Sequence, residues 1–169
     1  MKLLLTCSLI GTAIGTIFLS TPALSREVSP ASRPSSRDYI GITYRSNLPQ
    51  GFQDNGGWVV KGGQYGADIV QHDQTQMLWL GRVLPWQQGG AVPRKVVDVL
   101  EFPILTQSQK IRYAFCRLNG IPDREIFAIV EPSNTEFHTN IHQAWRANTK
   151  TEKIEPISPE GVTCENLDR

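Results

Sequence analysis

The sequence has no run of like charge and is almost neutral, with 17 Lys and Arg against 16 Asp and Glu. Nucleic acids and anionic membrane surfaces are bound through clusters of Lys and Arg side chains. No such cluster is found in this sequence. We therefore expect no nucleic acid among the partners of the protein.

The sequence also lacks the short motifs of several enzyme classes. It contains no G-x-S-x-G nucleophile elbow, no H-E-x-x-H zinc motif and no C-x-x-C pair. The glycine-rich stretch 62–66 does not end in the Gly-Lys-Ser/Thr of a Walker loop, and no helix is expected after it. We expect no cofactor.

The first 25 residues have the features of an export signal. Lys2 is their only charged residue, residues 3–19 are mostly apolar, and small residues at 23–25 suit a cleavage site. Cleavage before Arg26 would leave 144 of the 169 residues, with 16 basic and 16 acidic side chains and no transmembrane segment. The alternative is an uncleaved anchor, because the apolar stretch is nearly long enough to span a bilayer.

Cysteine is scarce, and its positions agree with export. Removal of the signal takes Cys7 and leaves Cys116 and Cys164, which lie 48 positions apart. In an oxidising compartment we expect these two to form a disulfide, which would stabilise the fold by on the order of 4 kcal/mol. The alternative is two free thiols. The expected location is secreted or periplasmic.

The remaining chain reads as one β-rich domain. Residues 26–38 are rich in Pro, Ser and charge and are expected to form a flexible linker. Residues 39–169 contain short runs of β-branched and aromatic residues separated by turn residues, which predicts a small antiparallel sheet or meander. One hairpin is expected from 67–73 and 77–84, joined by residues 74–76.

A second hairpin is expected at the centre of the domain, from 111 to 131, with its turn at 119–123. In its second run Ile126, Ala128 and Val130 alternate with Phe127 and Ile129, so both faces of the strand are apolar and should be covered. We expect Asp123 or Glu125 to pair with Arg117 across this hairpin.

Residues 134–146 allow two predictions. The stretch 133–136 has the form of a helix capping box, and apolar residues follow at helical spacing. Residues 141–147 also alternate, as a strand would. Both a helix and a strand remain open for this stretch.

The candidate catalytic residues fall into two groups. The histidines His72, His138 and His142 would form a weak metal site if 134–146 were helical, but on a strand the last two would lie about 13 Å apart. Five carboxylates on or beside central strands could supply a pair for glycoside hydrolysis. These are Asp98, Glu101, Asp123, Glu125 and Glu131.

Four tryptophans are many for a domain of this size. Trp79 and Trp145 have apolar neighbours and are expected in the core. Trp86 lies between Pro85 and two glutamines and is expected at the surface. Exposed aromatic rings bind sugars and peptides, so Trp86, Gln87 and Gln64 are the candidate ligand-binding residues. Gln71 and Gln74 could offer further hydrogen bonds to such a ligand.

Several short segments, taken in their order, resemble uncharacterised small secreted proteins of the kind found in cyanobacteria. The segments are 77–80 (MLWL), 97–100 (VDVL), 116–120 (CRLNG), 144–148 (AWRAN) and 161–166 (GVTCEN). The resemblance covers most of residues 64–166 and implies an exported domain, with no implied activity.

The sequence favours an exported, non-catalytic binding or structural module for an envelope ligand or protein. The alternative is an extracytoplasmic hydrolase that acts on an envelope polymer through paired carboxylates or a histidine-based metal site.

Overall fold

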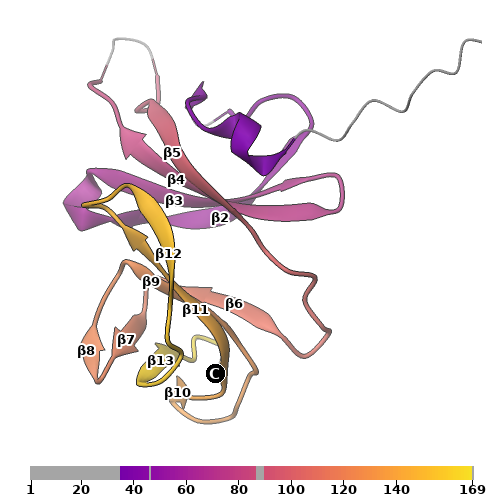
Figure 1. Cartoon of the computed structure of the whole chain (residues 1–169), viewed down its shortest axis with the longest axis vertical. Helices are drawn as coiled ribbons and strands as arrows, with labels where there is room; N and C mark the ends of the chain where they lie inside the picture. Colours follow the sequence, from indigo (N-terminus) through magenta and orange to yellow (C-terminus); the bar gives the residue numbers. More distant parts are fainter. Residues whose placement is uncertain (1–34, 46, 87–89, 169) are drawn as a thin grey trace, which may run out of the picture. The chain divides into compact units, whose positions relative to one another are not determined.

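The structure is a computed structural model that describes residues 35–45, 47–86 and 90–168 (Figure 1). All of them belong to one compact unit, Arg33–Arg169. The unit is mainly β and its strands pair antiparallel, as predicted. The export signal and most of the predicted linker lie outside the described residues. No helix in the described ranges is long and apolar enough to cross a membrane.

The elements, in chain order, are η1 (Ser36–Tyr39), β1 (Thr43–Tyr44), β2 (Phe52–Val60), η2 (Lys61–Gly63), β3 (Tyr65–His72), β4 (Thr75–Val83), β5 (Arg94–Glu101), β6 (Lys110–Tyr113), β7 (Cys116–Leu118), β8 (Ile121–Pro122), β9 (Ile126–Val130), β10 (Phe137–His138), β11 (Ile141–Asn148), β12 (Lys153–Ile157) and β13 (Val162–Glu165).

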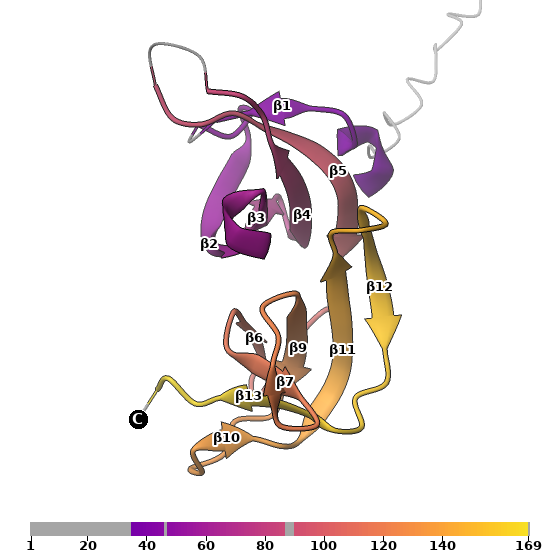
Figure 2. The same cartoon turned by 90° about the vertical axis from the view of Figure 1, so that its left-hand side faces the viewer.

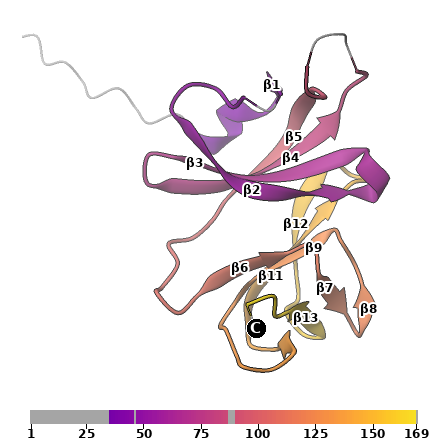
Figure 3. The same cartoon turned by 180° about the vertical axis from the view of Figure 1, so that it is seen from behind.

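The strands form three sheets. The five-stranded sheet has the order β1-β5-β4-β3-β2, and its strands β2 to β5 form a meander. The β9 sheet has the order β12-β11-β9-β6, and the β13 sheet has the order β10-β13-β7-β8. Figures 1 and 3 show the five-stranded sheet crossing over the β9 sheet. The predicted hairpin of 67–73 and 77–84 is confirmed as β3 and β4, which meet at the turn of Asp73 and Gln74.

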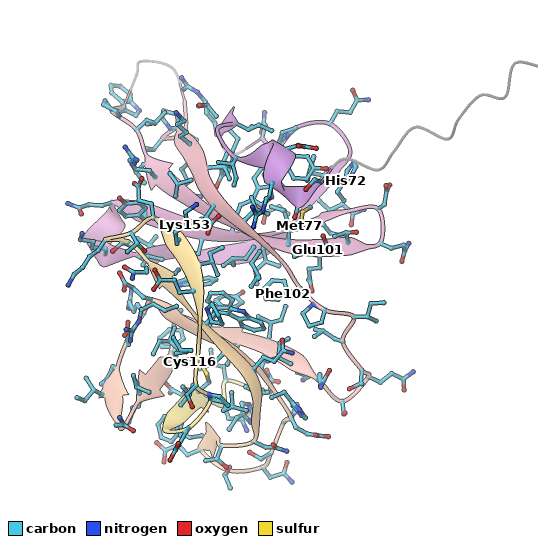
Figure 4. The ribbon with its side chains drawn as sticks, in the orientation of Figure 1. His72, Met77, Glu101, Phe102, Cys116 and Lys153 are labelled. Atoms are coloured by element: carbon cyan, nitrogen blue, oxygen red, sulfur yellow. A yellow bond between two sulfur atoms is a disulfide. The ribbon has the colours of Figure 1, made fainter. Side chains whose placement is uncertain are left out.

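Apolar side chains fill the space between the five-stranded sheet and the β9 sheet. Leu78 and Leu80 of β4 pack there against Phe127 and Trp145, and Phe102 lies between the two layers (Figure 4). The rings of Phe127 and Trp145 are stacked with centroids 5.4 Å apart. Trp79 and Trp145 are both buried, as predicted.

Strand β9 is buried on both faces, as its sequence predicts. Phe127 and Ile129 face the five-stranded sheet, while Ile126, Ala128 and Val130 face the β13 sheet and the disulfide. Side chains of a strand alternate between its faces, so a strand that separates two cores must be apolar at every position. All five residues of β9 are buried.

The outer face of the five-stranded sheet is covered by the N-terminal segment. Met77 and Trp79 of β4 pack there against Tyr39 of η1 and Phe52 of β2. Within the predicted linker, residues 36–38 begin η1, whose first turn is capped by Ser35 and Asp38. The first strand, β1, contains only Thr43 and Tyr44.

The predicted hairpin 111–131 is confirmed in two parts, β6 paired with β9 and β7 paired with β8, with the turn at Asn119 and Gly120. Strand β6 pairs with β9, with Ile111 opposite Ile129. Ala114 then adopts φ 68°, and the chain leaves the β9 sheet. Strand β7 pairs with β8 on one side and, as the prediction did not include, with β13 on the other, where Cys116 lies directly opposite Cys164 and is bonded to it. The expected disulfide links the end of the chain to its middle.

Residues 134–146 contain strands, which decides between the two predictions for this stretch. Ala144 faces the disulfide core while its neighbour Trp145 faces the core shared with the five-stranded sheet. A helix would place these adjacent positions near one face, whereas a strand sends them to opposite cores. Only the strand conformation therefore lets this stretch contribute side chains to both cores.

Candidate functional site

Two of the predicted ligand-binding residues lie at one shallow depression, here called the Gln64 hollow. Gln64, Tyr65, Arg82, Leu84 and Pro85 line this pocket of about 460 Å³. Trp86 follows directly, is 63% exposed as predicted, and donates a hydrogen bond to the Gly90 carbonyl at 3.2 Å. Gln87 lies outside the described residues.

Two polar side chains of the Gln64 hollow, those of Tyr65 and Arg82, are both bound to Glu152. The Tyr65 hydroxyl donates to Glu152 Oε1 at 2.7 Å, and Arg82 donates to both oxygens of the same carboxylate. Hydrogen bonds from Arg82 and Tyr65 lower the pKa of Glu152. A ligand in this hollow would have to compete with these internal bonds.

The three candidate histidines do not converge. His72 stacks on Phe52 and lies beside Met77, far from Cys116 (Figure 4). His138 is fully buried opposite Cys164, and its Nδ1 accepts from the Ser133 amide at 3.1 Å. His142 lies 3.1 Å from Glu131. No cluster of His, Cys, Asp and Glu in the described ranges could hold a metal ion.

Four of the five candidate carboxylates have separate partners. Asp98 accepts from the Ile154 amide and Glu125 from the Thr149 hydroxyl. Asp123 pairs with Arg146 and not with Arg117, so the predicted pair across the hairpin is wrong. Arg117 instead lies over the Phe137 ring, because β7 belongs to the β13 sheet.

A deeper site, which the sequence did not reveal, opens beside β6 and is here called the β6 groove. All four residues of β6 line a pocket of about 430 Å³, together with Asn55, Ile69 and Gln76 of the five-stranded sheet. Leu105 and Phe115 close one part of its rim. Leu167 and Asp168, just after the disulfide, close another.

A second pocket of about 230 Å³ extends the β6 groove toward the β3–β4 turn. It shares Gln76 and Leu105 with the first pocket and adds Gln71 and Gln74. The combined lining is therefore carboxamide and apolar, with few charges. Pockets of a few hundred Å³ with apolar walls and a small number of polar groups are typical ligand sites.

The carboxamides of the β6 groove differ in how far they are engaged. Asn55 donates to Gln71 Oε1 at 3.2 Å, and Gln71 donates to the Asp73 carbonyl at 3.0 Å. Among the described residues, no partner is found for the side-chain amides of Gln74 and Gln76. Each of these two amides offers a ligand both a donor and an acceptor.

One charged cluster stands on the C-terminal side of the β6 groove. Asp168 accepts from Lys110 at 2.8 Å and from Arg112. The hydrogen bond from Lys110, with the nearby charge of Arg112, lowers the pKa of the Asp168 carboxyl. Two cations around one anion leave this side of the groove with one net positive charge.

A bulge in β2 shapes the opposite wall. The register with β3 shifts between Asp54 and Gly57, and the Gly56 amide donates to Asp54 Oδ1 at 2.8 Å. The Tyr113 hydroxyl lies within 3.2 Å of where a Cβ on Gly56 would stand, while the Tyr113 ring stacks on Trp58. The sequence Asn55-Gly56-Gly57 is thus a bulge in a strand, where glycine content alone resembles a turn.

A buried polar cluster supports the sheet behind this bulge. Arg94 Nη1 lies 2.9 and 2.8 Å from the two oxygens of Asp68, which also accepts from the Tyr44 hydroxyl. Burial, with the nearby Asp68 carboxylate, raises the pKa of Tyr44, so this hydroxyl stays protonated. Glycines at 66 and 81 leave room for Arg94, because a Cβ there would lie 2.8 and 3.2 Å from its atoms. The cluster joins β1, β3 and β5.

The β6 groove residues gave little signal in the sequence, because they come from segments far apart. In chemical terms, the groove offers hydrogen bonds and apolar contact without an acid–base pair. No protein-family model, curated protein or solved structure matches this chain.

Proposed function

We propose that the protein is an exported, non-catalytic binding module and that the β6 groove is its ligand site. The observation that carries this proposal is the lining of the groove. The side chains of Gln74 and Gln76 offer donors and acceptors beside the apolar surfaces of Leu105 and Phe115. Such a lining binds a ligand by shape and hydrogen bonds.

Two features support the exported location. The first 25 residues have the composition of an export signal. The Cys116–Cys164 disulfide is compatible with an oxidising compartment outside the cytoplasm. We propose that the mature protein begins at Arg26 and is secreted or periplasmic.

The separate engagement of the carboxylates argues for binding over hydrolysis. A glycosidase needs two carboxyl groups on either side of one bond, about 5 to 10 Å apart. Asp98, Asp123 and Glu131 instead each have a different partner, the Ile154 amide, Arg146 and His142. The groove itself has only Asp168 as an acid, and that carboxylate is held by two cations.

The test starts from the full chain, expressed with its own signal and purified from the periplasm of a bacterial host. Mass spectrometry should find Arg26 as the first residue and no free thiol. The purified protein is then applied to arrays of cell-wall glycans and of random peptides. We expect the natural protein to bind to one of the two arrays, and the double variant Gln76→Ala, Leu105→Asp to lose this binding.

The matched control is Gln64→Ala combined with Leu84→Asp, which makes the same changes in the Gln64 hollow. We expect this control to bind like the natural protein. Turnover of a glycan by the natural protein, or binding that is lost only in the control, would contradict the proposal.

A further inference from the structure

The edges of the three sheets differ in how well they are protected. Edge strands expose unpaired backbone groups, and proteins blunt them with short length, charged side chains, proline or bulges. The two charged residues of β6, Lys110 and Arg112, are both bound to Asp168. Of the described edge strands, β1, β8 and β10 are two residues long, β12 contains Pro156, and β2 carries a bulge. β6 has four residues, no proline and no bulge.

The unprotected edge of β6 opens into the β6 groove. β6 pairs only with β9, so its other side has no neighbouring strand within the described chain (Figure 2). In an antiparallel sheet, alternate residues of an edge strand direct their N–H and C=O groups away from the partner strand. All four residues of β6 line the groove. The Tyr113 carbonyl already accepts from the Phe115 amide at 2.8 Å, and we expect the other backbone groups on the open side of β6 to be available to a ligand in the groove.

The two faces of β6 have different chemistry. Ile111 and Tyr113 face the five-stranded sheet, where the groove has Ile69 and Leu105. Lys110 and Arg112 point the other way, toward Asp168. A strand beside β6 would place alternate side chains against an apolar wall and against a net positive wall.

We propose that the groove binds an extended peptide, which pairs with β6 as an additional strand. This inference rests on the proposed function and names its ligand class. The peptide bound here has an apolar residue toward Ile69 and Leu105 and an acidic residue, one position away, toward Lys110. Strand addition to a sheet edge takes its affinity from backbone hydrogen bonds and its specificity from alternate side chains.

A second copy of the chain fits this edge less well. Antiparallel pairing of β6 with itself would place Lys110 and Arg112 of both copies on the same face of the joined sheet. Like charges on neighbouring strands are destabilising. The net positive charge of this wall instead complements an acidic side chain.

The test uses a displayed library of random nine-residue peptides, selected on the purified full-length protein. The best peptide is synthesised with an N-methyl group at each position in turn. N-methylation removes one backbone donor, so we expect alternate positions to lose about tenfold or more in affinity, the equivalent of one hydrogen bond. The positions between them should bind almost unchanged.

Two substitutions check the side-chain part of the inference. Leu105→Asp should abolish binding of the selected peptide, whereas Leu84→Asp in the Gln64 hollow should not. Lys110→Glu should weaken the binding of an acidic peptide more than the binding of the same peptide with its acidic residue replaced by Gln. Lys61→Glu, on exposed η2, is the matched charge control.

The outcomes separate this inference from the proposed function. If the protein binds a glycan through Gln76 and Leu105 and no selected peptide depends on the groove, strand addition is wrong and the proposed binding function still holds. Equal loss at every N-methylated position would also overturn strand addition. Dimerisation of the protein alone, abolished by Leu105→Asp, would assign the edge to a second copy. Binding that is insensitive to every groove variant would overturn both proposals.

Discussion

The Gln64 hollow and the β6 groove show two ways in which a surface is assembled from a chain. The hollow is built from residues 63–65 and 82–85, which are adjacent because Tyr65 pairs with Arg82 across the β3–β4 hairpin. The groove joins Asn55, Gln76, β6 and Asp168. Local pattern finds the first kind of surface, whereas the second depends on how the sheets stack.

The two surfaces also differ in how far their hydrogen-bonding groups are already engaged within the protein. In the hollow, Tyr65 and Arg82 are bound to Glu152. In the groove, Gln76 and the open edge of β6 remain available to a ligand. Exposure of an aromatic residue, as at Trp86, is therefore a weaker indicator of binding than unpaired donors and acceptors in a concave site.

Removal of the disulfide, which lies near the β6 groove and not near the Gln64 hollow, is expected to have the largest effect on stability. Replacing Cys116 and Cys164 by Ser should lower the free energy of unfolding by about 4 kcal/mol, because the unfolded chain regains the entropy of the closed loop. Urea unfolding at constant pH measures this change, with the reduced natural protein as the comparison.

The effect should also be local, because Leu167 and Asp168 lie three and four residues after Cys164. In the fraction that stays folded, amide resonances of 166–168 should shift while those of Gln64 and Tyr65 remain. A change in unfolding free energy below about 1 kcal/mol would contradict the assigned role of the bond.

The partly buried ion pair of Asp68 and Arg94 should contribute more to stability than the more exposed pair of Arg82 and Glu152 at the hollow. Asp68→Asn leaves Arg94 without its charged partner in a partly buried site, and should cost about 3 kcal/mol. Tyr44→Phe removes only one hydrogen bond and should cost about 1 kcal/mol. Glu152→Gln, at the exposed Arg82, should have a smaller effect than either. Equal costs for Asp68→Asn and Glu152→Gln in thermal unfolding would contradict this ranking.

The glycines of the two surfaces are needed for different reasons. A Cβ at position 57 would lie 2.5 Å from the Ala67 carbonyl and 2.7 Å from Asp68, so Gly57→Ala should cost about 2 kcal/mol. Gly62, in the turn beside the hollow, has open space around it and φ 61°. Gly62→Ala should cost about 1 kcal/mol, from backbone strain alone. Urea unfolding of both variants tests the difference, and the reverse order would rule out close packing at the bulge.

Acid should lower the stability of the folded protein through His138. Burial lowers the pKa of His138, and the positive charge of Arg112 lowers it further. The folded state then binds fewer protons than the unfolded state, whose histidine has a pKa near 6.5. The stabilisation is present above about pH 6.5 and is lost as pH falls toward the lowered pKa.

The comparison variant is His138→Asn, whose side-chain oxygen can still accept from the Ser133 amide. The difference in free energy of unfolding between the natural protein and His138→Asn should be constant above about pH 7. Below about pH 6 the natural protein should lose stability relative to the variant. A difference that does not change with pH would show that the histidine does not titrate on unfolding.

Sequence patterns predicted the parts of the fold that depend on neighbouring residues. The alternation in 126–130 predicted a strand covered on both faces, and the turn near Asp73 predicted the β3–β4 hairpin. The pairing of Cys116 with Cys164 followed from there being no other cysteine after the signal. Each of these needs only local periodicity or a count.

The rest depended on long-range choices that a pattern does not contain. Ala114 adopts a positive φ without being glycine, so the break between β6 and β7 has no sequence signal. Asp123 pairs with Arg146 because β11 lies beside β9, a neighbour that the hairpin prediction did not include.

The most direct test of the account is an NMR titration of the isotopically labelled, disulfide-bonded protein with the selected nine-residue peptide. The account predicts large amide shifts at residues 110–113, Asn55 and Gln76, and none at Gln64, Tyr65 or Trp86. Shifts confined to the Gln64 hollow, with the β6 amides unchanged, would contradict it.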